Sequence, residues 1–207
     1  MTEEKGDNLL TELRITDFAA ELGSSNPAPG GGSASALAGA LAACLAQMVA
    51  QLSGEGWEEF IARAQLLSNQ LLHLVNRDTE AFNQVMAALK LPKGTEEEKR
   101  ERRRALRLAN RHATEVPLQV MELALQVLAM AREAAQRGNK NCLSDAGVAG
   151  LLAAAACKGA AYNVLINLPG LRDDPFAAEA RARLAEILED VHVLESTIAA
   201  HVTRSLE

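Results

Sequence analysis

The chain has 207 residues and a formal net charge of −6, so it lacks the dominant basic character that general nucleic-acid binding requires. Hydrophobic residues make up 48% and aromatic residues only 3%, which favours closely packed helices built on alanine, leucine and valine. Its three cysteines, Cys44, Cys142 and Cys157, have no CxxC spacing and are interpreted as reduced thiols of a cytoplasmic protein. The polar, acidic N-terminus shows no signal peptide.

Almost every long segment has helical periodicity, and no run shows the strict alternation of a half-buried strand. A first short helix is expected from Thr16, whose hydroxyl can cap it, to about Gly23. Ser33 or Ser35 is expected to open a second helix, which reaches about Ser53 and is the only membrane candidate by length. Because it is mostly alanine, with two glutamines in its second half, we interpret it as a buried core helix of a soluble protein.

The third helix is predicted from Glu55 to Leu89. At 1.5 Å per residue it would be about 50 Å long, which favours a homodimer over a compact monomer. Its apolar stripe passes through Leu74 and Phe82, and Asp78 occupies the position between them. A carboxylate on such a stripe is costly unless it is paired, hydrogen-bonded or facing a cavity, so both a structural ion pair and a role in a site fit the pattern.

A capping box at Thr95–Glu98 opens a fourth helix, which reaches about Gln136 with Pro117 as a kink or break. Gly138 is expected to end it in a left-handed cap. Its first half carries arginines that share one face, and these are either a solvated surface with local ion pairs or a docking surface for an acidic small molecule: Arg100, Arg104, Arg107 and Arg111.

A fifth helix is predicted from about Ser144 to the residue before Pro169, and a last one from a cap at Asp174 followed by Pro175. The chain is therefore expected to be all-α, with residues 1–207 forming a single domain. That domain would be a bundle of about five to six helices, some of them long.

Three consecutive glycines, Gly30, Gly31 and Gly32, lie between Pro29 and Ser33. Glycine in tandem loses much backbone entropy on folding, so the bare backbone must serve either close packing or the approach of a ligand. The N–H groups of a helix that begins at Ser33 could donate to ligand oxygens.

A second polar group gathers at the start of the fifth helix and consists of Lys140, Asn141, Ser144 and Asp145. One of these side chains could simply cap the helix, yet together they offer more hydrogen-bonding capacity than a cap uses. The four histidines show no HExxH or close cysteine spacing, so we expect no metal site and no histidine base.

Three segments in a specific order carry a resemblance to a known family: Phe18–Leu22 with Pro27–Ser33, Asp78–Met86 with Lys90–Lys99, and Asn141–Ala149 through Gly159–Leu168. They resemble the cyclodeaminase/cyclohydrolase family of folate enzymes, over about residues 14–200. That family includes bacterial stand-alone methenyltetrahydrofolate cyclohydrolases and the C-terminal domain of formiminotransferase-cyclodeaminase.

The resemblance implies an all-helical fold, usually dimeric, that acts on a folate without a metal or redox cofactor. No formiminotransferase domain is present in the sequence, so we expect a monofunctional protein without nucleic-acid or membrane partners. Tyr162 departs from the pattern, because a smaller or aliphatic residue is expected there.

The implied reaction is hydrolysis of methenyltetrahydrofolate to formyltetrahydrofolate, in which water attacks a carbon held between two nitrogens. Asp145 is assigned as general base or proton shuttle, helped by Ser144 and Asn141. Asp78 would steady the cation or orient the pterin ring, and the two assignments could be exchanged.

Pro29 and the glycines through Ser33 would seat the flat part of the folate. Lys93, Lys140 or an arginine of the 100–111 face would receive its glutamate tail. Cyclodeamination of formiminotetrahydrofolate with release of ammonia is an alternative that the same carboxylates could serve, and a non-catalytic folate-binding helical protein is another. The catalytic assignment of the two carboxylates requires Asp78, Asp145 and the triple glycine to converge on one pocket.

Overall fold

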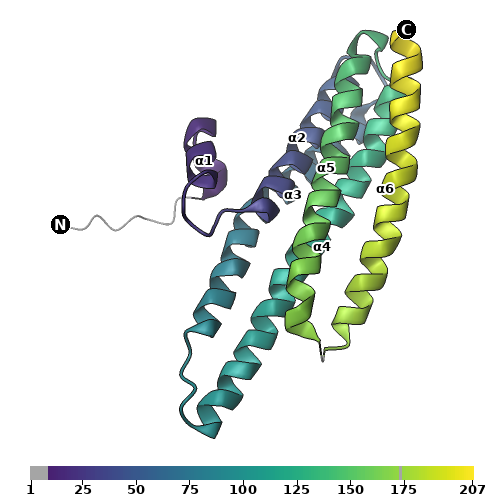
Figure 1. Cartoon of the computed structure of the whole chain (residues 1–207). Coiled ribbons are helices and arrows are strands. Elements are labelled where there is room, and N and C mark those ends of the chain that lie inside the picture. Colours follow the sequence, from purple (N-terminus) through teal and green to yellow (C-terminus); the bar gives the residue numbers. More distant parts are fainter. Residues whose placement is uncertain (1–8, 173) are drawn as a thin grey trace, which may run out of the picture.

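The computed structural model describes residues 9–172 and 174–207, and it is an elongated bundle of long helices (Figure 1). The prediction of an all-α fold is confirmed, and the described residues contain no strand. Three short 3₁₀ segments accompany the helices, at Leu10–Glu12, Lys140–Cys142 and Leu168–Leu171. The helices are α1 (Ile15–Leu22), α2 (Gly31–Gln51), α3 (Glu58–Leu89), α4 (Glu96–Arg137), α5 (Leu143–Asn167) and α6 (Phe176–Leu206). The acidic segment in which no signal peptide was found, residues 1–8, lies outside the described part.

Helices α2 and α5 form the middle of the bundle. Helix α2 packs against α3, α4 and α5, while α5 also packs against α4 and α6. The interior of both helices is mostly alanine and glycine, which lets their axes approach closely. A Cβ added at Gly39 would stand 3.2 Å from Leu71 and 3.4 Å from the Ala156 Cβ, so α2 meets α3 and α5 there without room for a side chain.

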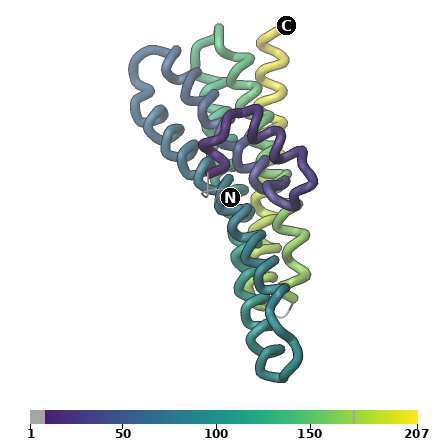
Figure 2. Tube along the Cα trace, turned by 90° about the vertical axis from the view of Figure 1, so that its left-hand side faces the viewer, coloured from purple at the N-terminus to yellow at the C-terminus, as the bar shows by residue number. Residues whose placement is uncertain are grey.

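Helix α1 stands apart from the bundle (Figures 1 and 2). None of its residues is buried, although Phe18 is partly covered by the core. Its start differs from the expectation, because Thr16 lies inside the helix and makes no cap to the backbone.

The predicted cap is right at α4 and wrong at other helices. Thr95 and Glu98 form the reciprocal capping box. Pro175 rather than Asp174 occupies the cap position of α6, which begins at Phe176, although the Asp174 carboxylate accepts a hydrogen bond from the Phe176 N–H. Neither Ser33 nor Ser35 caps α2. The helix already begins at Gly31, so both residues lie within it, and their side chains are buried against neighbouring elements.

Helix α3 begins three residues later than predicted, because Gly54 and Gly56 adopt positive φ angles of 90° and 85° in the preceding turn. Helix α4 continues through Pro117 without the predicted break, and Pro117 is buried there with Val116 and Val120. Gly138 is extended rather than left-handed, with φ −73° and ψ −178°.

In the described part of the chain, two helical stretches have the length and hydropathy of a membrane span: Gly31–Gln51 and Lys140–Leu171. Sequence analysis singled out only the first. Both lie at the middle of the bundle, with 56% and 50% of the apolar window buried against other helices. This burial is typical of core helices, in agreement with the interpretation of the first one.

Candidate active site

The Asp78 carboxylate of α3 is held against the first turn of α2. Asp78 Oδ2 accepts a hydrogen bond of 2.8 Å from the Ser33 backbone N–H, and the Ser33 hydroxyl oxygen lies 3.0 Å from the same carboxylate oxygen. The Ser33 hydroxyl is also 2.9 Å from the Val75 carbonyl and 3.3 Å from the Thr79 hydroxyl. The polar residue on the apolar stripe is therefore hydrogen-bonded to a helix N-terminus, rather than paired with a cation.

Burial and hydrogen bonding act on this carboxylate in opposite directions. Desolvation raises the pKa of Asp78 above its usual 3.8, while the hydrogen bonds from the Ser33 side chain and backbone lower it. Desolvation is the larger effect, so the net shift is upward. A carboxylate whose pKa is raised towards neutrality is a better proton acceptor than an exposed one.

The three glycines are not equivalent. A Cβ at Gly32 would stand 2.0 Å from Asp78 Oδ1 and 2.5 Å from its Cγ, so only glycine lets the carboxylate reach the helix. A Cβ at Gly31 would meet Asn163 at an ordinary 3.6 Å, and one at Gly30 would meet no other residue within 4 Å. Close packing therefore accounts for Gly32, whereas nothing in the described chain requires Gly30 or Gly31 to be bare.

The C-terminal half of α5 forms another wall beside the glycines. The Asn163 amide donates to the Gly159 carbonyl at 2.9 Å, and Ser35 donates to the Gly31 carbonyl at 2.7 Å. Sequence analysis did not assign Asn163 or Thr79 to the site. Asn163 falls within the third family-like segment, which was the available signal, whereas Thr79 simply follows Asp78 in the second.

Asp145 lies at the other end of α5. Because Gly31 faces Asn163, and Asn139 next to the start of α5 bonds Leu52 and Ser53 after the end of α2, the two helices run antiparallel. At 1.5 Å per residue, the stretch of α5 from Asp145 to Asn163 spans ~27 Å. Within one chain, the two carboxylates therefore do not converge with the triple glycine on one pocket.

The polar residues around Asp145 make few side-chain hydrogen bonds within the described chain. Neither Ser144 nor Asp145 caps α5, and Asn139 makes the contacts that join this end to α2. Among the described residues, we find no side-chain hydrogen bond or ion pair from four polar residues of this end: Lys140, Asn141, Ser144 and Asp145. Asp145 itself is half-buried and the other three are exposed.

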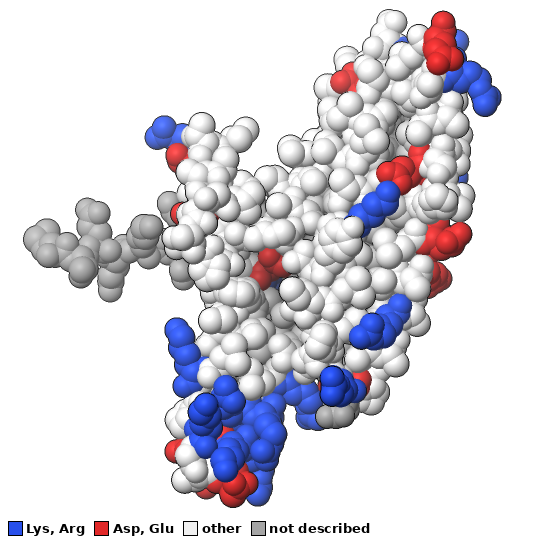
Figure 3. All heavy atoms as spheres, viewed as in Figure 1, with Lys and Arg blue, Asp and Glu red and all other residues white. Residues whose placement is uncertain are grey.

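Basic side chains gather at the end of the molecule where α3 turns into α4 (Figure 3). A hollow of about 570 Å³ there is lined by five arginines, together with Asn110 and Asp174: Arg100, Arg103, Arg104, Arg107 and Arg172. Lys93 lines a neighbouring hollow of about 270 Å³ with Lys99, Arg102 and Arg103. Arg111 is engaged elsewhere, since it pairs with Glu115 and stacks on Phe176. Lys140 lies at the opposite end of α5 from Asn163, so it and Lys93 cannot both serve one tail within a single chain.

Histidine and cysteine chemistry finds little support at this site. His112 contacts Arg77 and Gln84 in a hollow between α3 and α4, and His201 contacts the Ala135 carbonyl. No three His, Cys, Asp or Glu side chains of residues 9–172 and 174–207 gather as metal ligands would.

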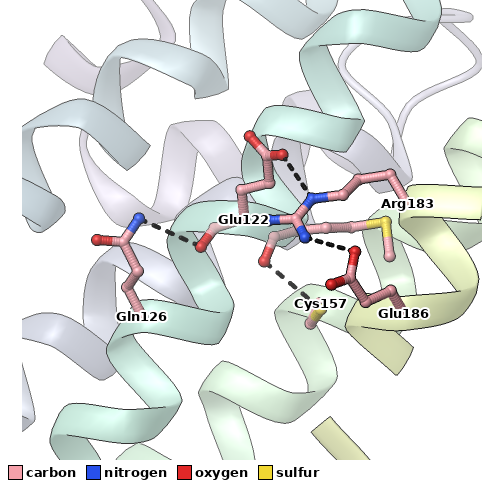
Figure 4. A network of polar contacts seen from close by, with 6 residues as sticks. Glu122, Gln126, Cys157, Arg183 and Glu186 are labelled. Atoms are coloured by element: carbon pink, nitrogen blue, oxygen red, sulfur yellow. Dashed lines mark hydrogen bonds and ion pairs between the residues drawn. The ribbon is translucent and has the colours of Figure 1, made fainter. Parts of the chain in front are cut away.

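Cys157 is buried between α4, α5 and α6, where its thiol contacts the Met121 carbonyl at 3.6 Å (Figure 4). Burial raises its pKa to about 12, so it stays a thiol at neutral pH. Nearby, Arg183 joins Glu122 of α4 to Glu186 of its own helix through ion pairs of 3.1 and 2.7 Å (Figure 4). This region fastens α6 to the bundle and is not a nucleophile site.

The sequence profile of the formiminotransferase-cyclodeaminase family matches residues 14–186, which include Asp78, the glycines and Ser33 at the start of α2, and the start of α5. The chain belongs to this family. It is 37% identical to methenyltetrahydrofolate cyclohydrolase of Methylorubrum extorquens, over 89% of this chain and 93% of that protein.

Two further relatives are named for cyclodeaminases. The chain is 38% identical to formimidoyltransferase-cyclodeaminase of Rattus norvegicus, over 96% of its own length but only 38% of that larger protein. The crystal structure of formiminotetrahydrofolate cyclodeaminase from Thermotoga maritima superposes with a TM-score of 0.82 at 27% identity, covering 94% of this chain and 98% of that one.

Proposed function

We propose that this member of the family hydrolyses methenyltetrahydrofolate to formyltetrahydrofolate, with Asp78 as the general base. The single observation that carries the assignment is the partly buried Asp78 carboxylate, held by Ser33 beside two glycines that the fold itself does not need. The similarity to the cyclohydrolase of M. extorquens along nearly its whole length supports the choice of substrate.

The reaction needs a proton acceptor at the bridging carbon. A water oxygen bonds to that carbon as Asp78 takes one of the water protons, which removes the positive charge of the amidinium group. The adduct then collapses: one carbon–nitrogen bond breaks, the hydroxyl proton is lost, and the departing nitrogen takes up a proton. Electrostatic attraction between Asp78 and the cation tightens binding mainly in the ground state, so the rate enhancement comes from proton transfer and positioning.

The glycine segment suits a flat ligand. Pro29, Gly30 and Gly31 would lie along the pterin or benzoyl ring, and the N–H groups at the start of α2 would face its oxygens. The glutamate tail would extend along α3 towards Lys93 and the arginine-lined hollow, which supplies opposite charge.

This assignment differs from the first one made from the sequence, in which Asp145 was the general base and Asp78 steadied the cation or oriented the ring. Asp145, with Ser144, Asn141 and Lys140, lies too far along α5 to act beside Asp78 in the same chain. A role for these four residues therefore depends on a second subunit.

Decay of the methenyl chromophore tests the reaction directly. Purified protein should accelerate the decay in a buffer where spontaneous hydrolysis is slow, and Asp78→Asn should abolish most of the acceleration. A wild-type protein that leaves the decay rate unchanged would rule out the cyclohydrolase assignment.

Cyclodeamination of formiminotetrahydrofolate is the second candidate, favoured by the fold similarity to the T. maritima protein of that name. The same carboxylate could move protons while the ring closes and ammonia leaves. Ammonia released from formiminotetrahydrofolate, in the absence of methenyl hydrolysis, would select this reaction.

The proposal also covers the location, the assembly and the cofactor requirement of the protein. The protein acts in the cytoplasm as a homodimer and a single domain, with a folate as substrate and no metal or redox cofactor. No nucleic-acid or membrane partner is required.

A further inference from the structure

The Asn163 side chain of α5 has hydrogen-bonding capacity that the fold does not use. Its Nδ2 donates to the Gly159 carbonyl at 2.9 Å, and this is its one side-chain hydrogen bond within residues 9–172 and 174–207. A carboxamide carries two N–H donors and an oxygen that accepts. One N–H group and the oxygen of Asn163 therefore stay available to another molecule.

The contact with Gly159 sets the orientation of this amide. If the amide were turned by half a rotation, Oδ1 would face the Gly159 carbonyl oxygen, and two acceptors would meet without a proton between them. Nδ2 is therefore the atom on the Gly159 side. Both atoms of the amide lie beside Gly31 of α2, where an added Cβ would stand 3.6 Å from Nδ2 and 3.9 Å from Oδ1.

The bond to Gly159 orients the side chain and adds little to the fold. Gly159 and Asn163 are four residues apart in α5, so the same carbonyl already accepts the backbone N–H of Asn163 in the helical ladder. A second bond to such a carbonyl is local and does not build the helix.

Asn167, one turn further along α5, shows what a structural amide does in this helix. Its Nδ2 donates to the Ala113 carbonyl of α4 at 2.6 Å. Pro117 has no N–H, so it leaves the Ala113 carbonyl without its helical donor, and Asn167 supplies one from the neighbouring helix. Asn163 serves no such carbonyl of another helix in the described chain.

The space in front of the Asn163 amide is open because Gly31 has no side chain. Gly31 is exposed and Asn163 is half-buried. Ser35 closes the contact between α2 and α5 one turn away: it donates to the Gly31 carbonyl at 2.7 Å and lies 2.5 Å from where a Cβ of Gly159 would be. A flat ligand that lies on Gly31 therefore meets the edge of the Asn163 amide.

Asp78 and Asn163 lie against adjacent residues of α2. The carboxylate packs on Gly32 and the amide on Gly31, and adjacent Cα atoms are about 3.8 Å apart. Together with the short contacts at the two glycines, this places the carboxylate and the amide within roughly 12 Å of each other. A ligand whose reacting carbon lies at Asp78 can therefore reach Asn163 with the far edge of a fused ring.

We propose that Asn163 binds the lactam edge of the pterin ring, where Oδ1 accepts the ring N–H and the second Nδ2 hydrogen is donated to the neighbouring carbonyl oxygen. The pterin ring carries a donor directly beside an acceptor, whereas the edge of the benzoyl ring carries neither. An amide is the neutral side chain that matches such a pair, as in the bidentate contacts of asparagine with an adenine edge. This inference rests on the proposed function, since it adds a substrate-binding residue to the site of Asp78.

Calorimetric binding of 5-formyltetrahydrofolate measures the contribution of Asn163. Asn163→Ala should raise Kd roughly 10- to 100-fold, because two hydrogen bonds to the ligand are lost. Its thermal midpoint should change by less than about 2 °C, because the bond to Gly159 is redundant. An unchanged Kd overturns the proposal.

Asn167→Ala is the matched control. It should lower the thermal midpoint, because the Ala113 carbonyl loses its donor, and it should leave Kd within about twofold of the wild type. Circular dichroism verifies that both variants are helical. A rise of Kd in Asn167→Ala equal to that in Asn163→Ala would mean that both act through the packing of α5, and it would contradict direct binding.

Asn163→Asp gives a readout that a packing role would not move. A carboxylate accepts but does not donate, so it should favour the 4-amino-4-deoxy analogue of 5-formyltetrahydrofolate, in which an amino group replaces the lactam oxygen. The wild type should bind 5-formyltetrahydrofolate at least about fivefold more tightly than this analogue, and Asn163→Asp should remove or reverse the preference. The same ratio of Kd values in both proteins excludes the lactam contact.

Failure of the contact and failure of the reaction give different results. A wild type that binds 5-formyltetrahydrofolate without accelerating methenyl decay removes the reaction, and the Kd of Asn163→Ala still decides the role of Asn163. A wild type that hydrolyses methenyltetrahydrofolate, beside an Asn163→Ala protein with unchanged Kd and KM, removes the contact and keeps the reaction. A wild type that binds no 5-formyltetrahydrofolate overturns the contact as well.

Discussion

In the proposed reaction the chemistry depends on the Asp78 carboxylate, and the partial burial of this group makes its ionised form unfavourable for the stability of the fold. Its pKa is raised because burial removes water from the ionised form more effectively than Ser33 replaces it. The folded state therefore binds this proton more tightly than the unfolded chain does. The contribution to stability is fully present below pH 3.8 and is lost as the pH rises through the native pKa.

Replacing Asp78 by Asn should separate stability from activity. The amide oxygen can still accept from Ser33 without the cost of a buried charge, so the thermal midpoint should rise by about 2–4 °C, or ~1 kcal/mol. Loss of the base should lower kcat roughly 100- to 10,000-fold. Calorimetry and the chromophore assay measure the two effects, and a variant that is both active and more stable would remove Asp78 from the mechanism.

The Ser33 hydroxyl should set the acid limb of the pH profile. Since its hydrogen bond lowers the pKa of Asp78, Ser33→Ala should raise that pKa further. Activity requires the ionised carboxylate, so the acid limb of kcat/KM should move to higher pH, with kcat on the alkaline plateau less affected. Thr79→Val, which removes a hydroxyl that lies 3.3 Å from the Ser33 hydroxyl and does not bond Asp78 within the described residues, is the comparison. A limb that moves to lower pH, or not at all, would contradict this assignment.

At the scale of elements, the proposed site is the junction where the start of α2 meets the side of α3. Helical periodicity predicted α3, and the carboxylate at position 78 of its apolar stripe made Asp78 a candidate site residue, which stays a prediction. The contact with Ser33 could not be predicted, because it depends on how two helices pack rather than on either sequence alone. Ser33 was expected to cap α2 from outside, yet burial places its hydroxyl between Val75 and Asp78.

The triple glycine offers a graded test of that junction. Gly32→Ala should destabilise the fold by ~1–3 kcal/mol and abolish activity, because its Cβ would overlap the Asp78 carboxylate. Gly30→Ala and Gly31→Ala should leave the stability within about 0.5 kcal/mol while they raise KM, since their space belongs to the ligand. Denaturant unfolding and kinetics on all three variants measure this. Equal destabilisation by the three would mean that the glycines serve packing alone.

At the scale of the whole molecule, the charges are unevenly placed. The basic end lies where α3 passes into α4, about 17 Å along α3 from Asp78, while the chain as a whole carries −6. The sequence predicted the arginine face but not its division, in which Arg111 is paired and the other three arginines of the face line a hollow with Arg103 and Arg172. That division arises from the 3₁₀ turn at Leu168–Leu171, which packs against α4.

The basic end should bind the glutamate tail of the substrate. Lys93→Glu with Arg103→Glu should raise KM roughly 5- to 30-fold for a substrate with several glutamates, and less for a monoglutamate, while kcat stays unchanged. Two substitutions of the same charge far from this end, Arg204→Glu with Arg14→Glu, are the control. An equal change in KM for both tail lengths would place the tail elsewhere.

The tight fit of Gly32 against Asp78 also constrains how such a sequence can change over generations. Any side chain gained at position 32 requires the carboxylate at position 78 to move or to be lost, so a substitution at one position limits what the other can hold. A lineage that abandoned the chemistry would be free to fill position 32 and recover stability, and it would then be closed to the return of the acid. In a related sequence, glycine at position 32 would therefore leave room for an acid at position 78, and a larger residue would exclude an acid in this position.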